Sequence, residues 1–186
     1  MLVLGLTGKT GSGKSMIASV LKENGAYIID ADKVAHDVLF HEDVKTKLVE
    51  CFGEGILNMS KEIDRKALAQ KAFSSREETE KLNMITHPAI RKVILDEIDT
   101  AKIEQCEVCV IDAAALLESE IRNDCDFIAV IFAPLDVRLK RIIKRDNMSV
   151  TDAKRRIDAQ KSDEFYLTHA DIIIINDGVT YFESEK

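Results

Sequence analysis

The sequence predicts an α/β fold whose sheet begins parallel and is interrupted by a helical insertion. Short runs of almost purely apolar residues recur along the chain, as expected for buried strands. The first two runs flank a helical pattern close to the N-terminus, which makes a βαβ unit. From residue 33 to residue 106, apolar residues instead recur at spacings of three and four, the period of amphipathic helices.

The first βαβ unit can be assigned residue by residue. Residues 2–6 (LVLGL) form the first predicted strand. A glycine-rich loop follows, and then a helix over residues 15–22, because Ile17, Val20 and Leu21 fall on one face. Gly25 lies where a C-terminal helix cap belongs, and residues 27–30 (YIID) form the second strand.

The middle block reads as helices joined by short turns. The stretches "DRKALAQKAF", "REETEKLNMI" and "PAIRKVILDEIDTAKIEQ" all have helical spacing with charged partners. Pro88 begins the last of them, and proline suits the first turn of a helix. The sequence therefore predicts three helices here, the last starting at Pro88.

Strand signals return at residues 108–111, 127–132 and 172–175. Each run is apolar without alternation, which predicts a sheet covered on both faces. Between the last two runs, "DVRLKRIIKRD" predicts an amphipathic helix. A second helix is expected to start at Ser149, with Asp152 completing a pattern that resembles a capping box.

Composition narrows the classes of protein. The 186 residues, 46% of them hydrophobic and 32% charged, suit one globular domain with an insertion. A net charge of −7 argues against a nucleic-acid surface, which usually needs a basic stripe, but not against a bound anion. No apolar run is long enough to cross a membrane, and the start lacks a secretory pattern, so we expect a cytoplasmic protein.

We interpret the C-x-x-C of Cys106 and Cys109 as core packing, because no second pair accompanies it.

The glycine-rich loop carries the strongest chemical signal. Four of the eight glycines lie within the first thirteen residues, and Gly8-x-x-x-x-Gly13-Lys14-Ser15 fits the P-loop pattern G-x-x-x-x-G-K-S/T. Such a loop turns backbone N–H groups toward phosphate oxygens, where the helix N-terminus adds positive charge. Lys14 is then expected to reach the β- and γ-phosphates, and the Ser15 hydroxyl to bind Mg²⁺. The alternative is a glycine-rich turn without a ligand.

The rest of the chain favours a small-molecule kinase that uses ATP. The N-K-x-D and D-x-x-G motifs expected of a GTPase are absent from the sequence. In a small P-loop kinase, one insertion holds the acceptor and another closes as a lid over ATP, which excludes water. The rivals are a P-loop kinase for a nucleoside or nucleotide and a non-catalytic nucleotide-binding protein.

Charged residues near the predicted strand ends and lid are candidates for catalysis. Asp32 follows the second strand, where it is placed to accept the proton of an attacking hydroxyl; the alternative is a helix N-cap, as for Asp30. Asp112 ends the third strand. It is either a carboxylate near the magnesium ion or a simple cap or turn residue. Arg141 and Arg145 share a helix face, where they stabilise phosphoryl transfer or form a solvated surface.

The residues closely resemble the dephospho-coenzyme A kinase family, nearly from end to end. "GLTGKTGSGKS" resembles its P-loop, "GAYIIDADKVAHDVL" its G-x-x-x-I-D-A-D segment, and "LNMITHPAIR" its L-x-x-I-x-H-P-x-I element. "APLDVRLKRIIKRDNMSVTDAKRRIDAQ" resembles its lid and "ADIIIINDG" its closing strand and turn.

The resemblance implies both an architecture and a reaction. The fold would be a P-loop NTPase core with a five-stranded parallel sheet (residues 1–32 and 107–186). A helical substrate-binding insertion (33–106) and a small helical lid (about 140–165) would complete it. The reaction would be transfer of the γ-phosphoryl of ATP, with Mg²⁺, to the ribose 3′-hydroxyl of dephospho-CoA. The small-molecule acceptor is the expected partner.

The resemblance also implies roles for single residues. Asp32 is the candidate base, His87 and Pro88 belong to the substrate side, and Asn176 is a candidate adenine neighbour. From the sequence alone, His87 could equally be a buried structural residue before a helix. The residues expected to line the ATP phosphates are Gly8, Gly11, Ser12, Gly13, Lys14, Ser15 and Met16, the last through its backbone N–H.

Overall fold

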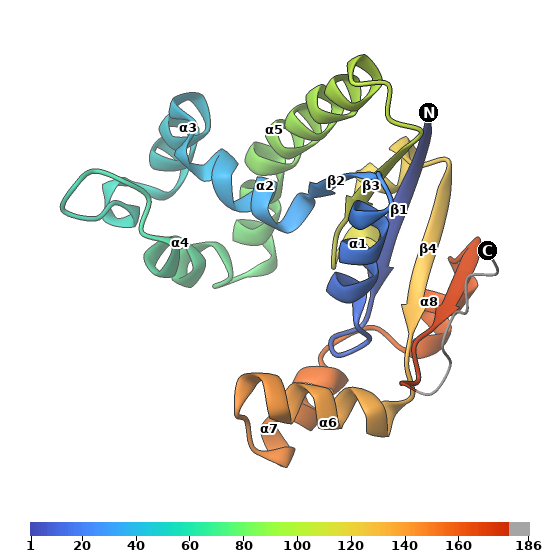
Figure 1. Ribbon diagram of the computed structural model, residues 1–186. Helices are drawn as coiled ribbons and strands as arrows, with labels where there is room; N and C mark the ends of the chain where they lie inside the picture. The colour runs from blue at the N-terminus through green and yellow to red at the C-terminus, as the bar shows by residue number, and fades with distance from the viewer. Residues whose placement is uncertain (179–186) are drawn as a thin grey trace. The chain divides into compact units, whose positions relative to one another are not determined.

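The computed structural model describes residues 1–178 and contains a five-stranded sheet (Figure 1). Its strands are β1 (Leu2–Gly8), β2 (Tyr27–Asp30), β3 (Val108–Asp112), β4 (Phe127–Phe132) and β5 (Ile172–Ile175). The order across the sheet is β2-β3-β1-β4-β5, and β1 pairs in parallel with both β3 and β4. The chain builds β2 and β3 on one side of β1 and then β4 and β5 on the other. The carboxyl end of β1 is therefore the topological switch point, where such sheets bind ligands.

The apolar runs became strands because most of their side chains are buried. Leu6, Val110 and Ile111 are fully buried in the central strands. The expected coverage of both faces is wrong for β5, where Ile172, Ile173 and Ile175 are 43–51% exposed. Among residues 1–178, β5 lies at the edge of the sheet and pairs with β4 alone, so fewer of the described elements surround it.

Helix α1 (Lys14–Glu23) follows β1 and packs against the sheet. Its buried face centres on Ala18, which clusters with Leu4, Leu6 and Val110. The helix ends in a Schellman motif: Ala26 N–H donates to the Leu21 carbonyl, and Gly25 N–H donates to the Lys22 carbonyl. Gly25 has φ of 89°, as that motif requires, so the predicted C-terminal cap is present.

An aspartate just before β4, and another just before β5, forms a pair of hydrogen bonds with the start of the neighbouring strand. Asp126, just before β4, accepts a hydrogen bond from Val3 N–H at 2.7 Å, and its own N–H donates to the Val3 carbonyl at 2.8 Å. Asp171, just before β5, does the same with Ile128, at 2.8 Å and 2.9 Å. Each aspartate thus extends the ladder by one hydrogen bond and fixes the register of the sheet.

The chain divides into two compact units. One holds Met1–Ile29 with the described residues from Ala101 onward, and the other holds Asp30–Thr100. The expected boundaries lie at 32/33 and 106/107. The helices of the Asp30–Thr100 unit are α2 (Ala31–Asp37), η1 (Val38–Phe40), α3 (Glu42–Phe52), η2 (Glu54–Ile56), α4 (Arg65–Ala72) and most of α5 (Arg76–Ile103). This unit has its own apolar core, formed by Val44, Leu48, Phe52, Ile56, Ile63, Leu68 and Ala72.

Helix α5 corrects one sequence prediction. Pro88 does not begin a helix but lies inside a single helix that runs from Arg76 to Ile103. Proline removes one backbone hydrogen bond and crowds the preceding turn, which costs about 3 kcal/mol in a helix interior. The apolar face of α5 offsets this cost, because Leu82, Ile85 and Ala89 pack against the core of this unit on both sides of the proline.

Five helices lie in the described residues after β3, around the strands β4 and β5. They are η3 (Leu116–Glu118), η4 (Glu120–Asp124), α6 (Leu135–Asp146), α7 (Val150–Asp158) and α8 (Asp163–Thr168). The predicted cap at Ser149 is present, since its hydroxyl oxygen accepts from Asp152 N–H at 3.1 Å. Ile142 of α6 packs against Ala153 and Ile157 of α7, which joins these two helices as a pair. None of the helices in residues 1–178 is long and apolar enough to span a membrane.

Candidate active site

The start of α1 is the most distinctive feature of the P-loop (Gly8–Ser15). Gly13 is its N-cap, with φ of 93°, and no side chain caps the helix. The first turn also contains no acidic residue. Five other helices have a side-chain cap, supplied by Asp30 (α2), Asp64 (α4), Ser75 (α5), Ser149 (α7) and Ser162 (α8). Helices α3 and α6 have no such cap either, but both carry acidic residues in the first turn. The first N–H groups of α1 are therefore left for an external anion, which the helix dipole also favours.

The glycines allow close approach from segments that follow β4. Gly11 has φ of 79°, and a Cβ there would lie 2.8 Å from the Arg138 carbonyl oxygen. A Cβ on Gly13 would overlap the side-chain amide of Asn176. The loop needs glycine at both positions, because its backbone is left-handed there and packed against other chain segments.

The Ser12 hydroxyl tests whether the loop fits a phosphate. Ser12 is 1% exposed, and its Oγ has no hydrogen-bond partner among the described residues. A buried hydroxyl without a partner is costly, and a phosphate oxygen would supply one. The residues of the loop therefore fit a bound polyphosphate.

Lys14, the first residue of α1, forms an ion pair with Asp112. Both side chains are mostly buried, at 16% and 13% exposed. Asp112 is the last residue of β3 and aligns with Leu6 of β1, two residues before Gly8. Carboxylate and hydroxyl oxygens are ligands that Mg²⁺ takes together with phosphate oxygens, so Asp112 and Ser15 are chemically suited to the predicted metal site.

Arg141 and Asn176 form hydrogen bonds with the backbone of the P-loop. Arg141 Nη1 donates to the Gly11 and Ser12 carbonyls at 3.3 Å and 3.1 Å, and also to the Asn176 carbonyl. The Asn176 side chain accepts from Arg141 Nη2 and donates to the Ser12 carbonyl. The structure thus brings together a predicted catalytic arginine and a predicted adenine neighbour, both bonded to the loop backbone.

Arg145 makes a different set of contacts, although it shares a helix face with Arg141. Its Nε and Nη2 donate to the Asp146 carboxylate at 2.7 Å and 2.9 Å, and Arg156 also pairs with Asp146. The hydrogen bond to Asp146 raises the pKa of Arg145, and the same bond holds the pKa of Asp146 below its usual value. The Arg145 side chain is 59% exposed, so its guanidinium is accessible.

Asp30 and Asp32 have distinct positions in the Asp30–Thr100 unit. Asp30 is the N-cap of α2, where its carboxylate accepts from Lys33 N–H at 2.9 Å. Asp32 lies in the first turn of α2 and is exposed. Its carboxylate forms no hydrogen bond or ion pair with any residue that the structure describes. The alternative of a helix cap therefore applies to Asp30, whereas the side chain of Asp32 is available.

A cavity of about 280 Å³ opens within the Asp30–Thr100 unit, and His87 lines it. Arg65 and Thr86 are its other polar residues. The Thr86 hydroxyl donates to the Leu82 carbonyl at 2.9 Å, which leaves Arg65 and His87 as the groups able to contact an anion. The apolar lining consists of Ala35, Leu39, Leu68, Ala69, Phe73, Leu82 and Ile90. Pro88, the other predicted substrate-side residue, is exposed and does not line the cavity.

Sequence reasoning missed a second group of residues around the P-loop. Lys9 forms an ion pair with Asp163, and the Thr10 N–H donates to the Gln160 side chain. Thr10 and Gln160 are separated by 150 residues, and no single motif contains both partners of either pair. The only local signal was a lysine inside a glycine-rich loop.

Comparisons with known proteins agree with this geometry. The family model described as dephospho-CoA kinase matches residues 2–181. A dephospho-CoA kinase of Corynebacterium glutamicum is 37% identical over 179 residues, covering 96% of this chain and 90% of that protein.

Solved structures extend the match to the fold. A Thermus thermophilus protein superposes with a TM-score of 0.81 at 26% identity, over 96% of this chain and 90% of that one. The dephospho-CoA kinase of Campylobacter jejuni superposes with a TM-score of 0.68 at 32% identity, over 94% and 88%. The P-loop kinase fold predicted from the sequence and the resemblance to the dephospho-CoA kinase family are both confirmed. The chain belongs to the dephospho-CoA kinase family.

Proposed function

We propose that the chain transfers the γ-phosphoryl group of Mg-ATP to the ribose 3′-hydroxyl of dephospho-CoA, giving coenzyme A. The observation that carries the proposal is the start of α1, which no side chain caps, together with the buried Ser12 hydroxyl, which has no hydrogen-bond partner in residues 1–178. Membership of the family supplies the acceptor.

The P-loop unit would bind ATP through backbone and charge. The N–H groups of Gly13, Lys14 and Ser15 would donate to phosphate oxygens, because α1 has no other cap. Lys14 would exchange Asp112 for the phosphates and neutralise the charge that develops on the transferring group. Ser15 and Asp112 would hold Mg²⁺, which would neutralise part of the charge on the phosphates when bound.

The Asp30–Thr100 unit would bind the acceptor. Asp32 would accept the proton of the 3′-hydroxyl as it attacks, and its exposed, unpaired carboxylate supports that role. The apolar walls of the cavity suit an uncharged chain, and Arg65 and His87 suit the diphosphate that dephospho-CoA carries. The cavity is therefore assigned to the acceptor, with His87 as a contact and Pro88 as the neighbour that orients it.

Arg141 and Arg145 of the proposed lid would stabilise the negative charge of the ATP phosphates. Arg141 would keep the P-loop carbonyls turned outward, so that its positive charge lies beside the phosphate site. Arg145 is accessible and would approach the transferring group when the lid closes. Positioning and positive charge are what phosphoryl transfer needs from protein.

A matched pair of isosteric variants tests the base. Asp32→Asn should lower kcat by at least about 100-fold, the usual contribution of a general base. Asp30→Asn should keep nearly full turnover, because asparagine caps a helix as well as aspartate. Steady-state turnover of dephospho-CoA and equilibrium binding of ATP are measured for both. Full turnover by Asp32→Asn would remove Asp32 from the mechanism.

A substrate panel tests the acceptor. ADP formation is measured with dephospho-CoA, with nucleosides and with nucleoside monophosphates, each at the same ATP concentration. Turnover with dephospho-CoA alone is expected. Phosphorylation of a nucleoside in preference to dephospho-CoA would favour the rival small-molecule kinase, and ATP binding without any turnover would favour a non-catalytic nucleotide-binding protein.

A further inference from the structure

Gln160, between α7 and α8, and Asp163, the first residue of α8, contact two adjacent residues of the P-loop. The Gln160 side-chain oxygen accepts from the Thr10 N–H at 2.9 Å. Asp163, at the start of α8, forms an ion pair with the Lys9 ammonium at 2.8 Å. The tip of the P-loop is therefore tied to the chain segment that follows the helix pair α6 and α7.

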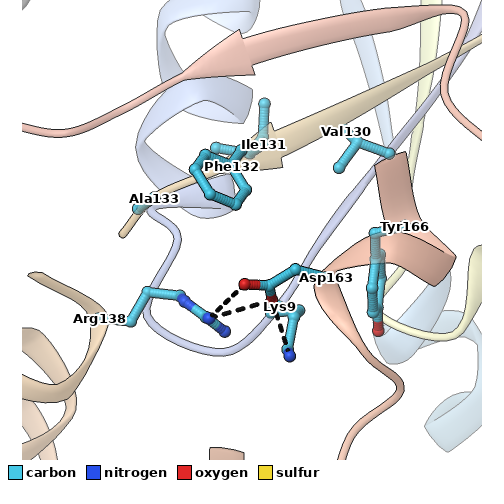
Figure 2. Close-up of a pocket in the computed structure, with 8 residues that line it drawn as sticks. All are labelled: Lys9, Val130, Ile131, Phe132, Ala133, Arg138, Asp163 and Tyr166. Carbon is cyan, nitrogen blue, oxygen red and sulfur yellow. Dashed lines mark hydrogen bonds and ion pairs between the residues drawn. The ribbon is translucent and has the colours of Figure 1, made fainter. Parts of the chain in front are cut away.

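Asp163 also pairs with Arg138 of α6, and Figure 2 shows its carboxylate lying between the two cations. Arg138 Nη2 donates to both carboxylate oxygens, at 3.1 Å and 3.2 Å. The side chains of Lys9 and Arg138 are only 12% and 3% exposed. A buried charge without a partner is strongly unfavourable, so the buried cations of Lys9 and Arg138 both favour the position in which the Asp163 carboxylate neutralises them.

Arg138 links the same network to the loop a second time. A Cβ added to Gly11 would lie 2.8 Å from the Arg138 carbonyl oxygen. The backbone of Gly11 therefore packs directly on α6. Its Nε and Nη1 are buried and have no hydrogen-bond partner among the described residues. Two cations and one carboxylate leave a net positive charge beside a loop that binds a polyanion.

A glycine-rich loop needs such ties more than other loops do. Ordering one residue costs about 1–2 kcal/mol, and glycine has the most freedom to lose. Contacts that hold Lys9, Thr10 and Gly11 before ATP arrives remove part of this cost from binding. The Thr10 N–H is already used by Gln160, so its role is to fix the loop rather than to contact phosphate.

We propose that Gln160 and Asp163 are positioning residues that hold the P-loop in its ATP-binding conformation, through Thr10 and through Lys9 with Arg138. The proposal rests on the proposed function only in taking ATP as the ligand of the loop. It assigns the segment after α7 a role in nucleotide affinity that the P-loop motif does not contain.

Two near-isosteric variants test the two ties separately. Gln160→Leu removes the acceptor of the Thr10 N–H, and Asp163→Asn removes the charge between Lys9 and Arg138. Glu164→Gln is the matched control, because Glu164 is also an acidic residue in the first turn of α8 but is exposed. The measurements are the Kd of ATP by calorimetry without acceptor, KM for each substrate, kcat, and Tm.

Each positioning variant should raise the Kd and KM of ATP by about tenfold, the effect of losing one such hydrogen bond or ion pair. The KM of dephospho-CoA and kcat should change little, and Glu164→Gln should match the wild type in every measurement. Asp163→Glu should recover part of the affinity. Lys9→Met combined with Asp163→Asn should lose less than the sum of the single losses, because the two residues act together.

Other results overturn the proposal. ATP affinity within twofold of wild type in both variants would show that residues 160–163 only support the fold. A parallel rise in both KM values with a fall in Tm would mean general loosening. If Asp163→Asn does not fold, Gln160→Leu decides alone. A wild-type protein that binds ATP but does not phosphorylate dephospho-CoA would contradict the proposed function and leave this test intact.

Discussion

Gly13 and Gly25 lie at opposite ends of α1 with nearly the same backbone conformation, at φ of 93° and 89°. Only Gly13 is crowded, since a Cβ there overlaps Asn176, whereas a Cβ on Gly25 has no neighbour within 4 Å. The two positions therefore separate the strain of a left-handed residue from the loss of space in the P-loop.

Gly13→Ala and Gly25→Ala use this difference. Both should lower the free energy of unfolding by about 1–2 kcal/mol, the cost of a left-handed backbone at alanine. Only Gly13→Ala should also weaken ATP binding, because Asn176 must leave the Ser12 carbonyl to make room. Denaturant unfolding and calorimetric ATP titration measure the two effects. Equal ATP affinity in the two variants would contradict the claim that ATP binding needs the space left by the missing side chain at Gly13.

Single residues were predictable where their role depends on neighbours in sequence. The spacing from Gly8 to Ser15 located the P-loop, and the hydroxyl at Ser149 located a helix start. Lys9 with Asp163, or Arg141 with Asn176, depends on chain segments brought together only by the fold. No local pattern encodes such pairs, so their contacts had to come from the structure.

At the scale of elements, the strands were the most predictable part of the fold. All five were located within two residues at each end, because each is a short apolar run with polar flanks. The start of α5 was misjudged, since proline is common in a first turn and its tolerance at position 88 depends on tertiary packing. Burial of an apolar face outweighed a local preference there.

The aspartates before β4 and β5 give a prediction at this scale. Asp126→Ala and Asp171→Ala should each lower stability by about 1–3 kcal/mol, because the N–H of Val3 or Ile128 loses its acceptor in a mostly buried position. Asp126→Asn and Asp171→Asn keep an oxygen acceptor and should lose less. Chemical denaturation measures the difference. If the alanine and asparagine variants are equally stable, the hydrogen bonds to the strand starts contribute nothing.

At the scale of the whole molecule, the two units separate the proposed tasks. The P-loop, Lys14 and Asp112 belong to one unit, while Asp32 and the cavity with His87 belong to the other. Family membership shows a kinase that uses ATP. The cytoplasmic location, the absence of nucleic-acid and membrane partners, the use of Mg²⁺ and the acceptor-binding role of the helical unit stay predictions.

Filling the cavity tests this division. Ala69→Leu adds bulk to the cavity wall, whereas Gln70→Leu adds the same side chain at the next, exposed position of α4. The first should raise the KM of dephospho-CoA by about tenfold, or about 1.4 kcal/mol, without changing the KM of ATP. The second should change neither. Initial rates with each substrate varied in turn provide the values, and an unchanged acceptor KM in Ala69→Leu would place the acceptor elsewhere.

The bare first turn of α1 also matters for handling the protein. A helix start with no internal cap accepts small tetrahedral anions as well as nucleotides. Sulfate from precipitation steps or inorganic phosphate in buffers would then occupy the loop and weaken apparent nucleotide affinity. Titrations carried out in chloride and in sulfate at equal ionic strength would therefore give different constants for the same preparation.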